Sequence, residues 1–140
     1  MPEMPKPVLP PTEITRPFWD AAREHRLAIQ RCDDCSFWVH WPQVRCPRCS
    51  SIRLTATDVS GRGRIYTFTI VHHVFMPPFE PDIPYSLALV ELDEQPGLRL
   101  LANIVDCPNE ALRIGMPVEV TFEDRGNVAL PQFRSAETAR

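Results

Sequence analysis

The second half of the chain carries the hydrophobic patterns of β-strands. Within residues 64–72, Tyr66, Phe68 and Ile70 fall on one face of an extended chain and threonines fall on the other. Residues 85–92 form a nearly continuous apolar run, which predicts a strand buried on both faces. The predicted strands are 64–72, 85–92, 98–105, 118–123 and 129–133. Together with a helical turn near 109–113, they predict a small closed β-barrel of the OB type, because closure removes exposed sheet edges.

The first half of the chain predicts one short helix and two short strands. Thr15 is suited to cap a helix over about residues 16–26. The side chains at helical spacing are Phe18, Ala21, Ala22 and His25. Two interpretations of this aromatic helix stay open: it covers the rest of the fold, or it docks on a partner. Residues 27–30 and 52–59 predict strands on either side of a cysteine-rich segment.

Proline positions and the change of pattern divide the chain. The predicted units are a proline-rich arm (1–14), a helix with a cysteine module (15–59), the OB-fold barrel (60–134) and a flexible tail (135–140). A second group of prolines lies in the apolar loop 74–84. Prolines pre-organise a loop, so less entropy is lost when it docks. This loop therefore either binds a partner or folds over the mouth of the barrel.

Four of the five cysteines form two Cys-x-x-Cys pairs that are separated by ten residues. The pairs are Cys32 with Cys35 and Cys46 with Cys49. Two such turns can direct four thiolates at one ion, so the spacing predicts a structural Zn²⁺ site that leaves no position open for catalysis. Iron bound by the same four thiolates is the main alternative. Disulfides would require an oxidising compartment, and a redox dithiol normally uses a single pair.

Composition excludes several classes of function. The net charge of −3 argues against a dedicated nucleic-acid binder, which is usually basic. The sequence has no apolar run of membrane-spanning length, and its N-terminus lacks the apolar core of a signal peptide. We therefore expect a cytoplasmic protein that has no membrane partner.

Charge is unevenly distributed along the chain. Residues 41–64 contain five arginines and one acid, whereas residues 80–110 contain seven acids and one arginine. The arginines beside the cysteines either compensate the charge of the metal site or, with Arg62 and Arg64, form a surface for a phosphate-bearing ligand or an acidic partner.

His72 and His73 are the only adjacent titratable pair with catalytic potential. Neighbouring residues of a strand point to opposite faces, so these imidazoles are not expected to act on one substrate. Cys107 precedes a proline and is interpreted as a small buried residue and not as a nucleophile. The sequence therefore predicts no catalytic residue.

The order of these features resembles a known family. The motifs that carry the resemblance are the aromatic helix, the two cysteine pairs and the segments 61–69, 84–92 and 114–120. The family is associated with acyl-CoA and has a rubredoxin-like zinc ribbon followed by an OB-fold; it is catalogued as domain of unknown function thirty-five. Ser36 and Ser50 depart from its pattern, because ribbon turns often have glycine there.

The resemblance implies a non-catalytic accessory subunit of a CoA-thioester enzyme in lipid or steroid metabolism. The expected partner is a thiolase-like protein, a lipid-transfer-type aldolase or an enoyl-CoA hydratase, with acyl-CoA as a candidate ligand. The candidate contacts are Arg62, Arg64, His72, His73, Phe75, Phe79 and Tyr85. The alternative is a nucleic-acid-binding module in which Tyr66 and Phe68 stack on bases.

Overall fold

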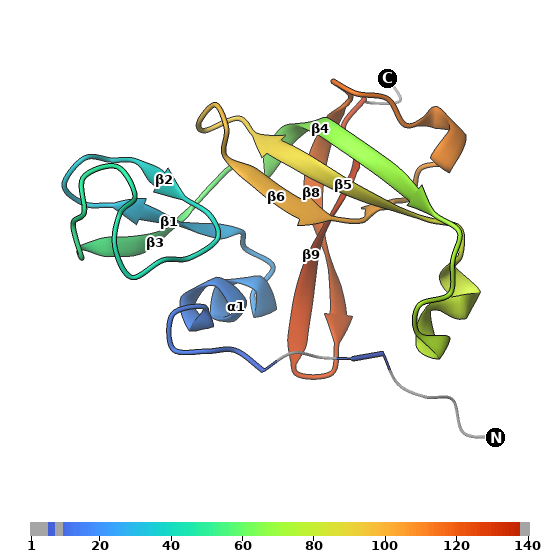
Figure 1. Ribbon diagram of the computed structural model, residues 1–140, viewed down its shortest axis with the longest axis horizontal. Coiled ribbons are helices and arrows are strands. Elements are labelled where there is room, and N and C mark those ends of the chain that lie inside the picture. Colours follow the sequence, from blue (N-terminus) through green and yellow to red (C-terminus); the bar gives the residue numbers. More distant parts are fainter. Residues whose placement is uncertain (1–5, 8–9, 138–140) are drawn as a thin grey trace.

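Two β-sheets and one α-helix make up the fold, which a computed structural model describes for residues 6–7 and 10–137 (Figure 1). One sheet has three strands in the order β2-β1-β3, and the other has six in the order β6-β5-β4-β8-β9-β7. The elements are α1 (Arg16–Arg23), β1 (Ala28–Cys32), β2 (Trp38–Val39), β3 (Leu54–Asp58), β4 (Arg62–Val71), β5 (Tyr85–Leu92), β6 (Arg99–Ala102), β7 (Ile104–Val105), β8 (Pro117–Arg125) and β9 (Val128–Ser135), with 3₁₀ turns η1 (Pro77–Asp82) and η2 (Asn109–Ala111). The predicted mainly β architecture is confirmed.

The predicted arm and tail lie partly outside the described residues, which omit 1–5, 8–9 and 138–140. Within the described part of the tail, the N–H of Ala136 donates to the carbonyl of Pro117 at 3.0 Å, and Glu137 forms an ion pair with Arg113. Among the described residues, no helix is long and apolar enough to cross a membrane.

Helix α1 ends three residues earlier than predicted. His25 has a φ of 58°, and its N–H closes the helix on the carbonyl of Ala22 at 2.8 Å. The His25 side chain instead stacks on Phe122 of β8. Phe18, Ala21 and Ala22 are buried, and the helix packs against β9 and β1, so it covers its own fold. Thr15 precedes the helix, but its hydroxyl bonds Thr12 and not a helix amide.

A β-bulge in β4 changes which aromatic side chain faces the core. The pairing with β5 shifts between Ile65 and Thr67, so Tyr66 is an extra residue in the ladder. Ile65 is buried, whereas Tyr66 is 47% exposed. The predicted face of Tyr66, Phe68 and Ile70 is therefore wrong at Tyr66, because the bulge reverses the alternation there.

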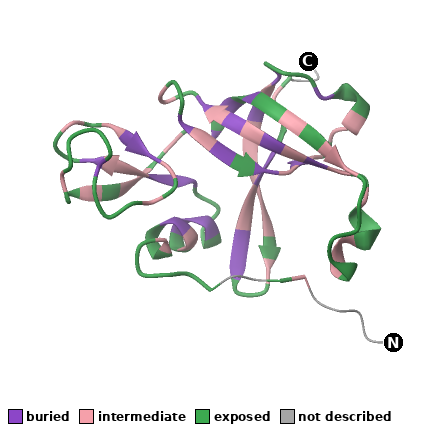
Figure 2. Cartoon of the chain, viewed as in Figure 1, coloured by how far each residue is buried: buried purple, intermediate pink, exposed green. Residues whose placement is uncertain are grey.

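Strand β5 is not buried on both faces as its apolar run predicted. Its residues alternate strictly between buried and half-buried (Figure 2). Ser86, Ala88, Val90 and Leu92 face the core, and the other four side chains face outward. The second apolar run also has one exposed face, since Leu101 of β6 is 59% exposed.

The six-stranded sheet curls so that its two edge strands come close together, but no ladder of hydrogen bonds joins these edges in the described chain. Its two edge strands, β6 and β7, are separated in the chain by Asn103 alone; β6 pairs antiparallel with β5, and β7 pairs parallel with β9. The amide of Asn103 donates to the carbonyl of Ser86 at 2.7 Å, and the Ser86 hydroxyl accepts from the N–H of Ile104 at 2.9 Å. No ladder joins β6 to β7 in the described chain. The predicted closed barrel is therefore corrected to a partly open OB-fold, held at this edge by side chains.

One hydrophobic cluster joins the two sheets. Phe133, Ile65 and Val118 come from the large sheet, and Ile29 and Trp38 from the small one. The largest fully buried side chains of the cluster include Phe133, Ile29, Ile65, Leu92, Val90 and Val118. Because the cluster is shared, the large sheet supports the small one.

Candidate metal centre and neighbouring surfaces

The four paired cysteines meet at the end of the small sheet. Their sulfur atoms all lie within 4.8 Å of one another. The Sγ atoms of Cys32 and Cys49 are 3.5 Å apart, and those of Cys35 and Cys46 are 3.6 Å apart. A tetrahedron with metal–sulfur bonds of about 2.3 Å has edges of about 3.8 Å, whereas a disulfide needs about 2.05 Å. The arrangement therefore fits a tetrahedral metal ion and not two disulfides.

Two equivalent turns present these sulfur atoms. The N–H of Ser36 donates to the carbonyl of Cys32 at 2.9 Å, and the N–H of Ser50 donates to the carbonyl of Cys46 at 2.9 Å. Ser36 and Ser50 both adopt left-handed backbone conformations, with φ of 66° and 67°. These are the positions where glycine was expected, so the serines preserve the turn geometry at some cost in backbone strain.

Hydrogen bonds from backbone N–H groups favour the thiolate form of some of the four cysteines. Burial raises the pKa of Cys32, but the N–H groups of Cys35 and Asp34 together with the thiols of Cys49 and Cys35 lower it to about 7. Cys49 receives an N–H from Ser51, which lowers its pKa, yet the neighbouring thiols outweigh this and raise it to about 12. Neighbouring thiols share protons in this way, and a bound dication displaces these protons because metal ligands must be deprotonated.

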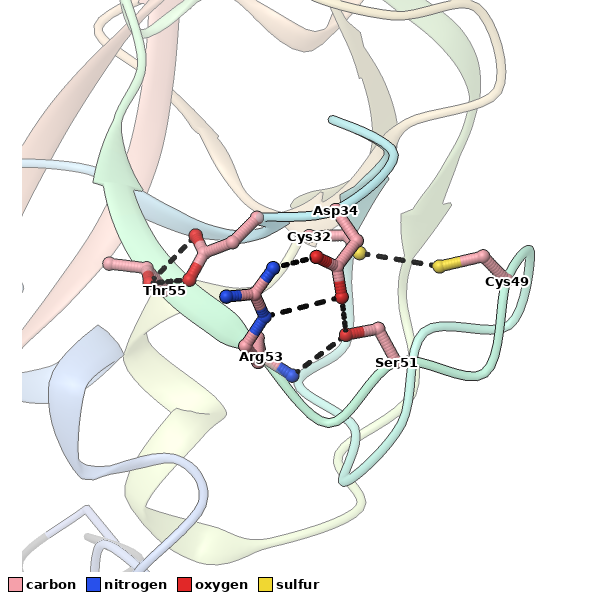
Figure 3. A network of polar contacts seen from close by, with 7 residues as sticks. Cys32, Asp34, Cys49, Ser51, Arg53 and Thr55 are labelled. Carbon is pink, nitrogen blue, oxygen red and sulfur yellow. Dashed lines mark hydrogen bonds and ion pairs between the residues drawn. The ribbon is translucent and has the colours of Figure 1, made fainter.

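An ion pair and a serine connect the two halves of the metal-binding module (Figure 3). Arg53 forms an ion pair with Asp34, and the Ser51 hydroxyl also donates to Asp34. The guanidinium lowers the pKa of the Asp34 carboxyl through its hydrogen bond. Arg45 binds the carbonyl of Ser50 at 3.0 Å. These arginines are therefore engaged within the module.

Most of the predicted contact residues do not converge. Arg62 and Arg64 begin strand β4, and His72 and His73 follow its end, which places the two pairs roughly 30 Å apart. Both histidines are exposed. Phe75 is 74% exposed, and its ring lies 4.6 Å from that of His73.

Phe79 and Tyr85 do share a site. They line a hollow of about 550 Å³ beside η1, and their ring centroids are 6.4 Å apart. Sequence reasoning missed the polar walls of this hollow, which include Lys6, Asn103, Asn109, Glu123 and Arg125. These residues come from four separate segments with no shared local pattern, so only the folded chain brings them together.

The aromatic residues considered for base stacking are not presented as a platform. The guanidinium of Arg99 lies 3.6 Å from the Tyr66 ring centroid and covers that ring. Phe68 is packed against the core cluster. The geometry of these two residues gives no support to a nucleic-acid interface.

The four-cysteine ribbon followed by an OB-type sheet defines the class of this protein. Residues 19–54 match the ChsH2 rubredoxin-like zinc ribbon domain, and residues 56–123 match the ChsH2 C-terminal OB-fold domain. The chain belongs to the DUF35 family, and both of these domain models match it. The cluster of cysteines is accordingly a structural zinc site of the rubredoxin-like type.

Named relatives extend this assignment. The chain is 39% identical over 138 residues to a probable enoyl-CoA hydratase alpha subunit of Thermomonospora curvata, covering 96% of this chain but 42% of that protein. It is 39% identical over 107 residues to a DUF35 domain-containing scaffold protein of Methanocaldococcus jannaschii, covering 74% of this chain and 73% of that one. The chain thus spans about two fifths of the hydratase subunit.

A solved structure resembles nearly the whole chain. A chain of the complex described as "Ltp2-ChsH2(DUF35) aldolase" superposes with a TM-score of 0.82 and 36% sequence identity. The match covers 94% of this chain and 99% of that chain. The likeness therefore includes the ribbon, the helix and the OB-fold together.

Proposed function

We propose that this protein is a non-catalytic accessory subunit that binds and supports a CoA-thioester enzyme. The carrying observation is its likeness, at 36% identity over nearly the full length of both chains, to a chain from an aldolase complex. Relatives named as a scaffold protein and as a hydratase subunit support the same role. The partner class is accordingly a thiolase-like protein, an aldolase or an enoyl-CoA hydratase.

The proposed role of zinc is structural. Cys32, Cys35, Cys46 and Cys49 are the proposed ligands, because their four sulfur atoms lie within 4.8 Å of one another and can supply all four ligands of one ion. A complete protein shell leaves no position at which the metal could activate water. Four reduced thiols also favour a reducing compartment, so we expect the protein to act in the cytoplasm.

Acyl-CoA is a candidate ligand of the assembled complex. Phe79 and Tyr85 offer aromatic walls in the 550 Å³ hollow. Lys6 and Arg125 also line it, and their charges are paired there with Asp82 and Glu123. The other proposed contacts, Arg62, Arg64, His72, His73 and Phe75, lie outside that hollow and are assigned to the enzyme partner.

Reconstitution tests the proposal. Each thiolase-like protein and each enoyl-CoA hydratase of the same genome is co-expressed with this chain, and the products are analysed by size-exclusion chromatography with light scattering. We expect one enzyme to form a stoichiometric complex and to gain soluble yield or turnover. The isolated chain is assayed in parallel and should turn over no CoA thioester. Absence of any complex, together with unchanged enzyme yield and rate, would remove the proposal.

A further inference from the structure

On the outer face of β4, β5 and β6, side chains of neighbouring strands lie side by side in rows across the sheet. The ladder places Thr67 of β4 beside Leu89 of β5, and Leu89 beside Leu101 of β6. The next row on one side pairs Thr69 with Leu87. Because side chains alternate along a strand, these residues all point away from the core.

This face is apolar at its centre yet uncovered. Leu101 is 59% exposed and Tyr66 is 47% exposed. Leu87 and Leu89 are half-buried, although the apolar run of β5 has the composition of a strand covered on both sides. Within the described residues, the outward side chains of β5 are only half-buried, and Leu101 beside them is exposed (Figure 2). The described residues therefore leave apolar surface on this face that a partner protein can bury.

Two hollows extend the same surface. Leu87 lines both the 550 Å³ hollow beside η1 and a second, mostly apolar hollow of about 260 Å³. The second hollow lies between α1, the ribbon and β6, and is walled by Trp19, Trp41 and Leu101. A stable interface needs about 800 Å² from each partner, which exceeds what a few leucines provide. The central leucines and both hollows together form a surface of suitable extent.

The charge at one end of this face is unbalanced. Arg64 pairs across to Glu91, and Glu91 to Arg99, in a single row, with Arg62 beyond them. Glu91 forms its ion pair with Arg99. Within the described residues, Arg62 and Arg64 have no carboxylate within ion-pair distance. A partner that covers the leucines would therefore gain from carboxylates placed over these two arginines.

We propose that the outer face of β4, β5 and β6 is the surface that binds the CoA-thioester enzyme, and that the enzyme presents apolar side chains bordered by acidic residues. This inference rests on the proposed function and assigns it a surface. The enzyme takes the place of the missing cover over β5, and its side chains enter the flanking hollows. We call this surface the leucine face.

A charge placed at the centre of the leucine face tests the assignment. The probes are the thiolase-like and hydratase proteins of the same genome, each purified singly, with the intact zinc-loaded chain titrated against them by calorimetry. Leu101→Glu should weaken binding at least about 30-fold, which is the effect of a hot-spot residue. Ile52→Glu is the matched control: Ile52 lies in the ribbon, is 66% exposed, and should change binding less than about 2-fold.

A second variant tests the charged end of the face. Arg62→Glu should weaken binding about 10-fold at low salt, and the loss should shrink at high salt because ions screen the interaction. Zinc content and thermal midpoint verify that each variant is folded. Since Arg62 is exposed, this variant keeps the test valid if Leu101→Glu does not fold.

The possible outcomes distinguish the accessory role of the protein from the assignment of its binding surface. If the wild-type chain binds an enzyme and both variants bind it equally well, the leucine face is wrong while the accessory role stands. If the wild-type chain binds none of the enzymes, the proposed function fails and this surface assignment fails with it. A wild-type homodimer that Leu101→Glu dissociates would make the occupant a second copy of the chain and would also overturn the assignment.

Discussion

At the scale of single residues, the two cysteine turns illustrate how much a local pattern determines. Ser36 and Ser50 occupy left-handed positions that glycine would normally fill. The turns still form, because the hydrogen bond that closes each one needs only backbone atoms. Spacing of the cysteines therefore predicted the cluster even though a favoured residue type was missing.

The metal centre gives the first prediction at this scale. Cys46→Ser should reduce bound zinc from about one equivalent per chain to a small fraction, because serine does not replace a thiolate ligand. Elemental analysis of the purified protein measures this. Cys107→Ser is the control, since Cys107 lies outside the four-cysteine cluster and is only partly buried against the core; it should keep its zinc and lose at most about 1 kcal/mol of stability. Full zinc occupancy in Cys46→Ser would contradict the ligand assignment.

His40 gives a pH dependence. Burial lowers the pKa of His40 to about 4 from its ordinary value of 6.5, and its Nδ1 is buried with no partner among the described residues. Above pH 6.5 the side chain is neutral in both states, so its contribution is constant. As the pH falls below 6.5, the unfolded chain takes up a proton that the folded chain refuses, and stability is lost until about pH 4.

The expected loss from His40 is roughly 2 kcal/mol of unfolding free energy between pH 7 and pH 5. Urea denaturation at the two pH values measures it. His40→Phe cannot take up this proton, so its pH dependence should be shallower than that of the wild type. Acid release of zinc affects both proteins, and the difference between them isolates the histidine. Equal slopes would show that His40 does not titrate as described.

At the scale of elements, one side chain connects the ribbon to the OB-fold. The Gln95 amide in the β5–β6 turn accepts from the N–H of Trp38 and donates to its carbonyl, both at 3.0 Å. The side chain thus acts as a short strand partner for β2. Gln95→Ala should cost about 1–3 kcal/mol, because it leaves two partly buried backbone groups unpaired.

Denaturation and hydrogen exchange at the Trp38 amide measure the effect of Gln95→Ala. Asp93→Ala, an exposed position of the same turn, serves as the control and should be nearly neutral. If both variants have the stability and exchange rate of the wild type, Gln95 does not hold the two sheets together.

The strands and the helix agree only in part with what the sequence predicted. The predicted strands 64–72, 85–92, 118–123 and 129–133 exist, because hydrophobic alternation depends only on neighbours along the chain. The predicted strand 98–105 is divided at Asn103 into β6 and β7, which pair with different strands. The predicted orientation of the Tyr66 side chain was wrong, because the bulge at this residue depends on how β4 pairs with β5. Helix α1 ended early because His25 turns away to contact Asp124 and Phe122, almost a hundred residues later.

At the scale of the whole molecule, zinc and the OB-fold stabilise different parts. Removing the metal with a chelator should unfold the three-stranded ribbon, which is too small to hold itself together without its metal. The six-stranded sheet and its loops contribute most of the shared hydrophobic cluster, so that sheet should remain folded. Hydrogen exchange measures both: amides of β1 and β3 should lose protection, and those of β5 and β8 should keep it. Uniform protection after complete zinc removal would show that the metal is dispensable.

The sequence by itself determined the four-cysteine site, the order of elements and the family of this protein, because spacing and periodicity are local properties. Tertiary structure alone decided which face of β5 is left uncovered and how Asn103 and Ser86 join the sheet edges. It also decided that Phe79 and Tyr85 share a hollow from which the histidines are excluded. Exposure is the free surface that remains after every long-range contact has formed, so an apolar run cannot reveal whether its cover comes from its own chain or from another protein.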